Sequence, residues 1–347
     1  MHCHLLIPGL SSSFFPATPD SLQVLQLPAL NALLVRGKQD SCTSGDWMGW
    51  LCREFGLEKQ HDWPIAALTL LAENDNPASG FWLLADPVHL QLQRDRMVLM
   101  DADGLGITND EAAELIATLN SHFASDDLIF SFVRPDRWHI RLLSLPRIET
   151  CPLEAVIGKN IREFLPNGPD GKFWHRTLNE IQMLLHDHPV NVAREQRGDL
   201  PINSIWPWGG GVLPDKTTPP YTKVWAEDTL AIGLAISSGT PHAKQPEIAA
   251  EWLQHAAVPG QHLIFLNSLR NAALHGDVHR WRENLLKLET EWFAPLYHAL
   301  SRGRLTRLSL TISENNCVRT FSATRADLWK FWRRKKPFMI FSGASST

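Results

Sequence analysis

Short apolar segments that read as strands alternate along this chain with segments of helical periodicity, and this alternation constrains the fold most. The strand-like segments are residues 4–8, 81–85, 128–133, 138–143, 203–206, 262–266 and 307–312, and the helix-like ones are 28–35, 47–55, 108–123, 172–186, 227–237 and 278–300. Glycine or proline follows most of them, as expected where regular elements end. The pattern predicts a layered α/β protein.

The clearest single signal is the segment 108–123. Thr108 precedes it as a potential N-cap, and Glu111 stands three residues later, which completes a capping-box pattern. Leu115 and Leu119 follow at helical spacing. We therefore predict a helix that begins directly after Thr108.

Hairpin signals concentrate in the middle of the chain. The strand-like runs 128–133 and 138–143 flank Pro135-Asp136, a pair typical of a turn. This concentration predicts a second module, residues 89–199, inserted into a core formed by residues 1–88 and 200–347. The segment Phe81 to Ala85 is expected to end at Asp86-Pro87.

Composition and charge narrow the class of protein. The 347 residues are 44% hydrophobic with a net charge of -4, which argues against a general nucleic-acid binder. There is no run of 18 apolar residues, and the N-terminal apolar segment lacks a positive flank, so we expect neither a membrane span nor a signal peptide. The five cysteines are odd in number and contain no C-x-x-C pair, which indicates reduced thiols in the cytoplasm.

Two neighbouring segments are candidates for anion binding. His188, Asn191 and Arg194 follow a predicted helix and have the chemistry to hold an anionic substrate. The alternative is a helix end interrupted by Pro189. Glycines 209–211 would let the backbone approach a phosphate, but they lack the lysine of a P-loop, and a flexible loop is the competing interpretation.

Three further patterns favour ordinary surface structure. His275 and His279 are spaced for a shared metal but lack the intervening glutamate of the zincin motif. The run from Arg333 to Lys336 follows three aromatic residues and suits nucleic acid or acidic lipid, yet it holds only four charges. Asp101, Asp103 and Gly104 resemble half of a calcium loop whose closing glutamate is absent.

In the segment from Leu178 to Gly211, a predicted helix is followed by His188-Pro-Val-Asn191, Arg194, Gly198, Asn203 and Trp206-Pro-Trp208-Gly-Gly-Gly211. In order and spacing this segment resembles archaeal-type cofactor-independent phosphoglycerate mutases of the alkaline phosphatase superfamily. Residues 27–37, 224–239 and 263–277 resemble further family segments. The segment 86–90 and the loop at Trp208 look most like the shorter branch of RpfE-type regulatory proteins.

The resemblance implies an alkaline-phosphatase-like layered α/β core with a central, mostly parallel sheet, plus an inserted α+β domain. In the enzymes two divalent metals, such as manganese or zinc, activate a serine that carries the phosphoryl group. The implied ligand-binding residues are His188, Asn191, Arg194, Asn203, Trp208, Gly209 and Gly211. They imply a small phosphorylated ligand as the partner.

The chain departs from the family where the metals are bound. Pro8-Gly9 stands where the first strand ends in a ligating aspartate, Arg270 and Leu274 replace an aspartate and a histidine, and Ser313-Glu314 replaces Asp-His. Proline and leucine cannot coordinate a metal, and arginine repels one. No nucleophilic serine can be assigned in residues 44–47.

We therefore predict a protein without a metal cofactor that has lost its catalytic centre and has a regulatory or phospho-ligand-binding role. One alternative is an active phosphoglycerate mutase or metal-dependent phosphohydrolase with a rearranged metal site. Its candidate ligands are His2, His4, His275, Asp277 and His279. The other alternative is a protein or nucleic-acid interaction module that uses the basic, aromatic C-terminal segment. The sequence does not define an oligomeric state.

Overall fold

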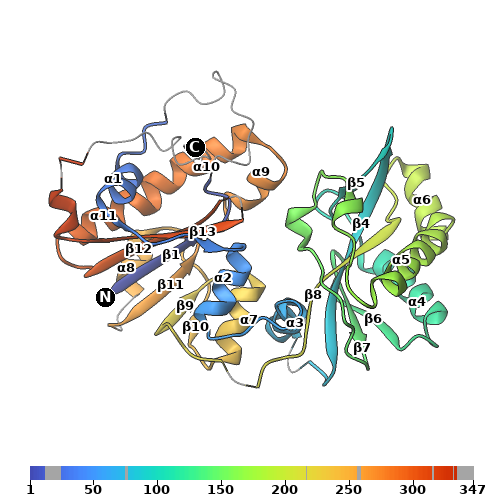
Figure 1. Ribbon diagram of the computed structural model, residues 1–347. Helices are drawn as coiled ribbons and strands as arrows, with labels where there is room; N and C mark the ends of the chain where they lie inside the picture. The colour runs from blue at the N-terminus through green and yellow to red at the C-terminus, as the bar shows by residue number, and fades with distance from the viewer. Residues whose placement is uncertain are drawn as a thin grey trace. The chain divides into compact units, whose positions relative to one another are not determined.

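The computed structural model describes residues 1–11, 25–74, 77–215, 217–255, 259–314, 316–330 and 332–333. The chain divides into two units (Figure 1): residues 1–57 with 216–347 form unit 1, and residues 58–215 form unit 2. Unit 2 extends beyond the expected insert, residues 89–199, at both ends. The reason is that β4 (Phe81–Gln93) and β8 (Ser204–Gly211) pair with each other in its sheet.

Unit 1 is built on a mixed, mostly parallel sheet with the strand order β10-β9-β11-β1-β12-β13-β2, in which β3 also pairs with β13. The parallel strands are β1 (His2–Ile7), β9 (Lys223–Trp225), β10 (His242–Ala243), β11 (Gln261–Phe265) and β12 (Arg307–Glu314). The antiparallel strands are β13 (Cys317–Thr324), β2 (Lys38–Gln39) and β3 (Thr43–Ser44).

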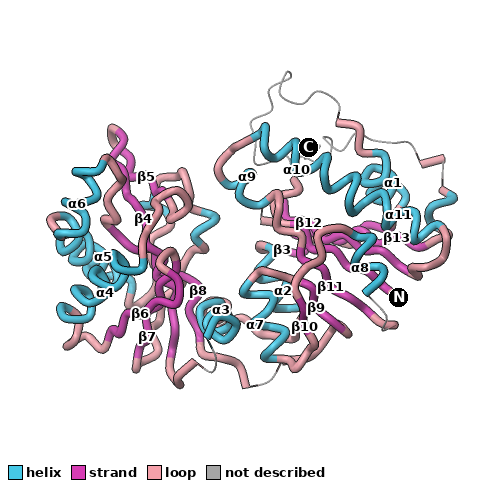
Figure 2. Tube along the Cα trace, turned by 180° about the vertical axis from the view of Figure 1, so that it is seen from behind, coloured by secondary structure: helices cyan, strands magenta, loops and turns pink. Residues whose placement is uncertain are grey.

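Helices cover both faces of this sheet (Figures 1 and 2). One face carries α1 (Pro28–Arg36), α8 (Ala249–His255), α10 (Val278–Leu288) and α11 (Ala294–Ser301), the last two joined by a π-helical turn, Glu289–Phe293. The other face carries α2 (Trp47–Glu54) and α7 (Thr229–Ser237), while the short helix α9 (Arg270–Leu274) follows β11.

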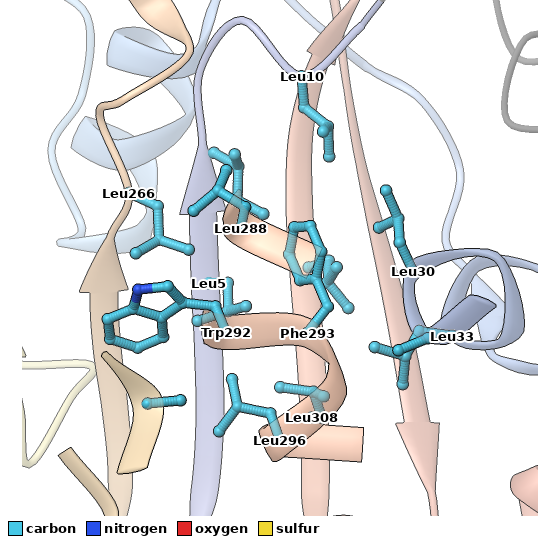
Figure 3. Packing of buried hydrophobic residues seen from close by; sticks show 14 of the residues in the cluster. Leu5, Leu10, Leu30, Leu33, Leu266, Leu288, Trp292, Phe293, Leu296 and Leu308 are labelled. Carbon is cyan, nitrogen blue, oxygen red and sulfur yellow. The ribbon is translucent and has the colours of Figure 1, made fainter. Parts of the chain in front are cut away.

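The main core of unit 1 lies between the sheet and the first of these helical layers (Figure 3). Leu5 of β1 and Leu308 of β12 are fully buried against Trp292, Phe293 and Leu296. Side chains alternate between the two faces of a strand, so the residues next to Leu5 on β1 and next to Leu308 on β12 point to the opposite face of the sheet. Burial of such side chains stabilises the fold by roughly 1.5–3 kcal/mol each.

A distant glutamate caps the first helix of unit 1. The N-cap position of α1 is Leu27, whose side chain cannot accept a hydrogen bond. The buried carboxylate of Glu289 instead accepts the backbone amides of Ala29 (2.6 Å) and Leu30 (3.1 Å). It thereby satisfies two of the amides that every helix start leaves unpaired. Burial raises the pKa of Glu289, although these two amides partly lower it.

Unit 2 contains a second, antiparallel sheet with the order β5-β4-β7-β6 and with β8 also paired to β4. Its remaining strands are β5 (Arg96–Met100), β6 (Leu128–Arg134) and β7 (Arg137–Leu142). Its helices are α3 (Ile65–Asn74), α4 (Asn109–His122), α5 (Gly171–His186) and α6 (Pro189–Arg197). The capping box of Thr108 and Glu111 is confirmed at the start of α4.

Two expectations about unit 2 are wrong. Glycines 209–211 are part of strand β8, where they pack against α3 and β4, and do not form a flexible loop. Asp86-Pro87 lies inside β4 and does not end it. Between Ala85 and Val88, β4 is paired with β8 alone. A proline, which has no backbone N–H, is tolerated where one side of a strand lacks a partner.

The expectation of wholly reduced thiols is also wrong, because Cys42 and Cys317 form a disulfide with their Cα atoms 5.7 Å apart. The pairing arises because β3 lies antiparallel to β13, with Ser44 opposite Cys317. The two cysteines are 275 residues apart, so no local spacing reveals the bond. Within the ranges that the structure describes, no helix is long and apolar enough to cross a membrane.

Candidate functional site

The carboxyl ends of the parallel strands in unit 1 form the edge at which open α/β sheets usually bind ligands. β1 ends at Ile7, β11 at Phe265 and β12 at Glu314, and these three strands are neighbours in the sheet. The ends of these strands, of β9 and the start of β13 bring two arginines and two carboxylates to this edge: Arg270, Arg319, Asp228 and Glu314. We call it the carboxyl edge.

A close backbone approach defines the centre of the carboxyl edge. Gly9 follows β1 with φ +78°, and a Cβ there would lie 3.0 Å from Cα of Arg270 and from the carbonyl oxygen of Leu269. Only glycine fits that space and that left-handed conformation without strain. The carbonyl of Gly9 accepts a hydrogen bond of 2.7 Å from Nε1 of Trp281. These contacts hold the end of β1 against α9 and α10.

Arg270 is one of the two arginines of the carboxyl edge. Its Nη1 lies 3.4 Å from Oδ2 of Asp228, and both side chains are largely buried. Its guanidinium carbon lies 5.2 Å from the ring centroid of Trp47, a cation–π contact. Asp228 is fixed as the N-cap of α7, because Oδ1 accepts the amides of Leu230 and Ala231. The positive charge is thus held in one place by groups from two elements, α7 and α2.

A second carboxylate at this edge is almost fully buried. Glu314, at the end of β12, is 5% exposed, and its Oε1 accepts a hydrogen bond of 3.5 Å from Oγ of Ser11. Nε of Arg319, on β13, lies 4.0 Å from its Oε2. A buried carboxylate needs such partners, because desolvation disfavours an isolated charge.

The expected nucleophile segment, residues 44–47, begins α2. Asp46 is the N-cap, and its carboxylate accepts the amide of Gly49 at 2.7 Å. Ser44 pairs with Cys317 in the sheet, and its carbonyl accepts a hydrogen bond from Nη2 of Arg53. The described contacts in this segment are those of a helix start, and none of them assigns a nucleophile.

Two of the predicted ligand-binding residues lie inside unit 2. Asn191 is fully buried, and its amide bridges the carbonyls of Leu185 and Ile202 while its oxygen accepts the amide of Ile202. Arg194 is 1% exposed and donates to Glu111 (2.7 Å), to the carbonyl of Leu200 (2.9 Å) and to that of Leu105. Both side chains join α6 to neighbouring segments of the same unit.

The side chains of His188 and Asn203 also form hydrogen bonds within unit 2. Nδ1 of His188 accepts the amide of Val190, so Nε2 carries the proton and donates to Oγ1 of Thr118 at 2.9 Å. Burial lowers the pKa of His188, which favours the neutral ring. The side chain of Asn203 exchanges two hydrogen bonds with the backbone of Leu90. A ligand-binding role for these residues stays a prediction.

Trp208 and the two glycines lie on β8, where the sheet meets α3. Nε1 of Trp208 donates to Oδ2 of the buried Asp86 at 2.7 Å. Burial raises the pKa of Asp86 to about 6. A Cβ on Gly209, which has φ +65°, would lie 2.9 Å from Cβ of Ile65, and one on Gly211 would lie 2.5 Å from Cβ of Pro64. Within unit 2 these positions are therefore required for packing.

The proposed alternative metal ligands occur at two places. His2 and His4 lie on β1, near its start, whereas His275, Asp277 and His279 follow α9, which contacts the far end of the same strand. Asp277 is the N-cap of α10, and His279 faces Glu283 at 3.6 Å. In the part of the chain that is described, no three His, Cys, Asp or Glu side chains are grouped to hold a metal ion.

The remaining sequence patterns lie outside any described site. Asp101, Asp103 and Gly104 form a turn between β5 and α4. Of the basic C-terminal run, Arg333 is described and donates to the carbonyl of Gly37, while residues 334–336 lie outside the described residues. Trp329 and Trp332 are exposed.

Comparison with known proteins shows where this chain is related. No protein-family model matches it. It is 35% identical over 117 residues to the 2,3-bisphosphoglycerate-independent phosphoglycerate mutase of Methanosarcina barkeri, which covers 33% of this chain and 29% of that protein. It is 30% identical over 146 residues to the enzyme of the same name from Methanosarcina mazei, which covers 40% and 36%. The chain thus matches about a third of the length of these curated relatives.

Solved structures extend the likeness over most of the chain. A protein from Pyrococcus horikoshii superimposes with a TM-score of 0.56 at 12% identity, over 93% of this chain and 87% of that one. The cofactor-independent phosphoglycerate mutase from Thermoplasma acidophilum gives a TM-score of 0.46 at 14% identity, over 93% and 89%. The first of these supports the expected α/β fold with a second, antiparallel sheet.

Over about a third of its length, the chain is distantly homologous to archaeal cofactor-independent phosphoglycerate mutases. The predicted resemblance to these proteins is confirmed to that extent. The sequence did not reveal the partner of Arg270. Asp228 falls inside the predicted helix 227–237, whereas in the structure it is the N-cap of α7, and its pairing across 42 residues depends on the fold.

Proposed function

We propose that this chain is a phosphoglycerate-mutase-like protein that has lost the two-metal catalytic centre and acts as a regulatory or phospho-ligand-binding protein. The observation that carries the proposal is the ion pair of Arg270 with Asp228 at the carboxyl edge. A guanidinium stands where the family resemblance predicts a metal-binding aspartate.

The residues of the carboxyl edge do not fit two divalent cations. Such ions need several carboxylate or imidazole ligands on a shared centre. Pro8 and Leu274 offer no donor atom, and Arg270 adds a positive charge that would repel a cation. The carboxylates of Asp228 and Glu314 have protein partners of their own. We therefore expect no two-metal chemistry at the carboxyl edge.

Guanidinium groups favour a phospho-ligand at the same edge. Arginine binds phosphate and carboxylate oxygens with paired, charge-assisted hydrogen bonds. Arg270 is positioned by Asp228 and Trp47. Arg319, on β13, lies beside Glu314 at the end of β12. An anion at this edge would meet two arginines in place of two metal ions. The RpfE-type assignment and a cytoplasmic location stay predictions within this proposal.

The test combines turnover with binding. The full chain is assayed for mutase and phosphatase activity on 3-phosphoglycerate with manganese and with zinc, and binding of 3-phosphoglycerate is measured by calorimetry without metal. The proposal expects binding without turnover, weakened by Arg270→Gln and unchanged by the exposed Arg302→Gln. Metal-dependent turnover would overturn it in favour of an active mutase or phosphohydrolase. Absence of binding would overturn the phospho-ligand role.

A further inference from the structure

A cavity of about 330 Å³ opens on the sheet face of unit 1 that carries α2, at a distance along β1 from the carboxyl edge. Its floor is formed by residues of β1, β12 and β13. One wall is α2, with Trp50 and Glu54, and another is the segment that contains Asp40, Ser41 and Thr43. The disulfide from Cys42 to Cys317 joins this second wall to the start of β13.

The floor of the cavity consists of imidazoles and hydroxyls in two hydrogen-bonded rows that cross three strands. Each row begins with a histidine of β1, continues to a hydroxyl of β12 and ends at a hydroxyl of β13. The rows are His2-Ser309-Ser322, with distances of 2.8 and 2.8 Å, and His4-Thr311-Thr320, with distances of 2.7 and 2.7 Å. Burial, as the main cause, lowers the pKa of His2 to about 4 and of His4 to about 3, so both rings are neutral.

This polar floor contrasts with the opposite face of the same strands. There Leu5, Leu308, Leu310 and Phe321 form part of the main apolar core. Six polar side chains on one face of three neighbouring strands contribute little to apolar burial, and each must find hydrogen-bond partners to avoid a desolvation cost. Ser322 and Thr320, the hydroxyls that end the two rows, are partly exposed, and each uses one hydrogen bond in its row. A hydroxyl keeps further hydrogen-bonding capacity after one such bond, so the floor can still bind a polar ligand.

Unpaired charges of opposite sign line the same cavity. Arg307 lies on β12, Glu54 lies on α2, and neither forms an ion pair with any described residue. Among the described residues, the hydroxyl of Tyr221 donates to Oε2 of Glu54 at 3.4 Å. Burial raises the pKa of Glu54, which reflects the cost of a carboxylate without a cation beside it. Asp40 adds a second carboxylate at the rim.

We propose that this cavity binds a small zwitterion of the free α-amino-acid class, with the ligand carboxylate on Arg307 and its ammonium group on Glu54. Arginine binds a carboxylate through two parallel hydrogen bonds. Arg307 lies on the floor of the cavity and Glu54 on its α2 wall, so a ligand that carries both charges can bridge them. The two carboxylates exceed the single arginine, which disfavours a phosphorylated anion. Both ring nitrogens of His4 already have partners, Thr311 and Tyr221, which disfavours a metal ion.

The first experiment titrates the full chain with each of the twenty free α-amino acids by calorimetry. At least one is expected to bind, and its N-acetyl derivative and its methyl ester are each expected to bind at least tenfold more weakly, because each lacks one charge. If no amino acid binds at concentrations up to 10 mM, or if the blocked forms bind as well as the free one, the proposal is wrong. This site is independent of the phospho-ligand proposal, which uses the carboxyl edge.

Matched variants then assign the two charges. Arg307→Gln and Glu54→Gln preserve size and, for Glu54, the acceptor of the Tyr221 hydrogen bond, so both are expected to fold with unchanged circular dichroism. Each is expected to weaken binding at least tenfold, which corresponds to about 1.4 kcal/mol. The exposed controls Arg325→Gln and Glu58→Gln should bind like the unmodified chain. Equal affinity of all four variants would overturn the assignment.

Discussion

Arg194 is where a ligand-binding role and a structural role give opposite predictions. Its guanidinium is 1% exposed and joins Glu111 to two backbone carbonyls of unit 2. In Arg194→Met the side chain keeps its apolar length but leaves those acceptors without a donor. Removal of one partner of a buried ion pair costs about 3–5 kcal/mol. Glu111 keeps Arg197 and the amide of Thr108, so we expect the lower end, about 3 kcal/mol.

The assay is urea unfolding followed by circular dichroism. For a slope of about 2 kcal/mol per molar urea, a loss of about 3 kcal/mol lowers the midpoint by about 1.5 M. The matched control is Arg197→Met, which removes an exposed arginine from the same Glu111 and should cost less than about 1 kcal/mol. An Arg194→Met protein of unchanged stability that fails to bind 3-phosphoglycerate would refute the structural reasoning and support the original ligand-binding prediction.

Three further changes test other parts of the fold. Gly9→Ala is expected to destabilise unit 1 by about 2 kcal/mol, because the new Cβ meets the α9 backbone at a left-handed φ; an unchanged melting temperature would contradict this. Glu289→Gln weakens two amide hydrogen bonds at the start of α1 and should cost about 1 kcal/mol in urea unfolding, whereas the exposed Glu283→Gln should cost nothing measurable. Burial raises the pKa of Asp86 from 3.8 to about 6, so ionisation destabilises the folded state as pH rises between these values. Asp86→Asn should therefore gain roughly 2 kcal/mol relative to the unmodified chain between pH 4 and pH 7, and a pH-independent difference would contradict the shift.

The order of elements was predictable because local signals carry it. Thr108 and Glu111 marked the start of α4, and the apolar run near His4 marked β1. Pairing between distant segments was not predictable from a single sequence. Glycines 209–211 look like a loop by composition, and they form a strand only because α3 and β4 leave no room for side chains there.

The candidate site was likewise predictable only in part. The resemblance located Pro8 and Arg270 at positions that matter in the family, and the structure brings both segments to the carboxyl edge. It could not show that Asn191 and Arg194 would use their hydrogen-bonding groups within unit 2. The two polar rows beside His2 and His4 were hidden because serine and threonine on β12 and β13 read as ordinary strand residues.

The central claim is that the carboxyl edge has exchanged its metal centre for an arginine. The most direct test is to purify the full chain without chelators or an affinity tag, supply manganese and zinc, remove loosely bound ions, and measure tightly bound metal per chain. The account predicts close to zero metal, unchanged by Arg270→Gln. Two metal ions per chain would contradict it and would identify the protein as a metal-dependent phosphotransferase or phosphohydrolase with a rearranged site.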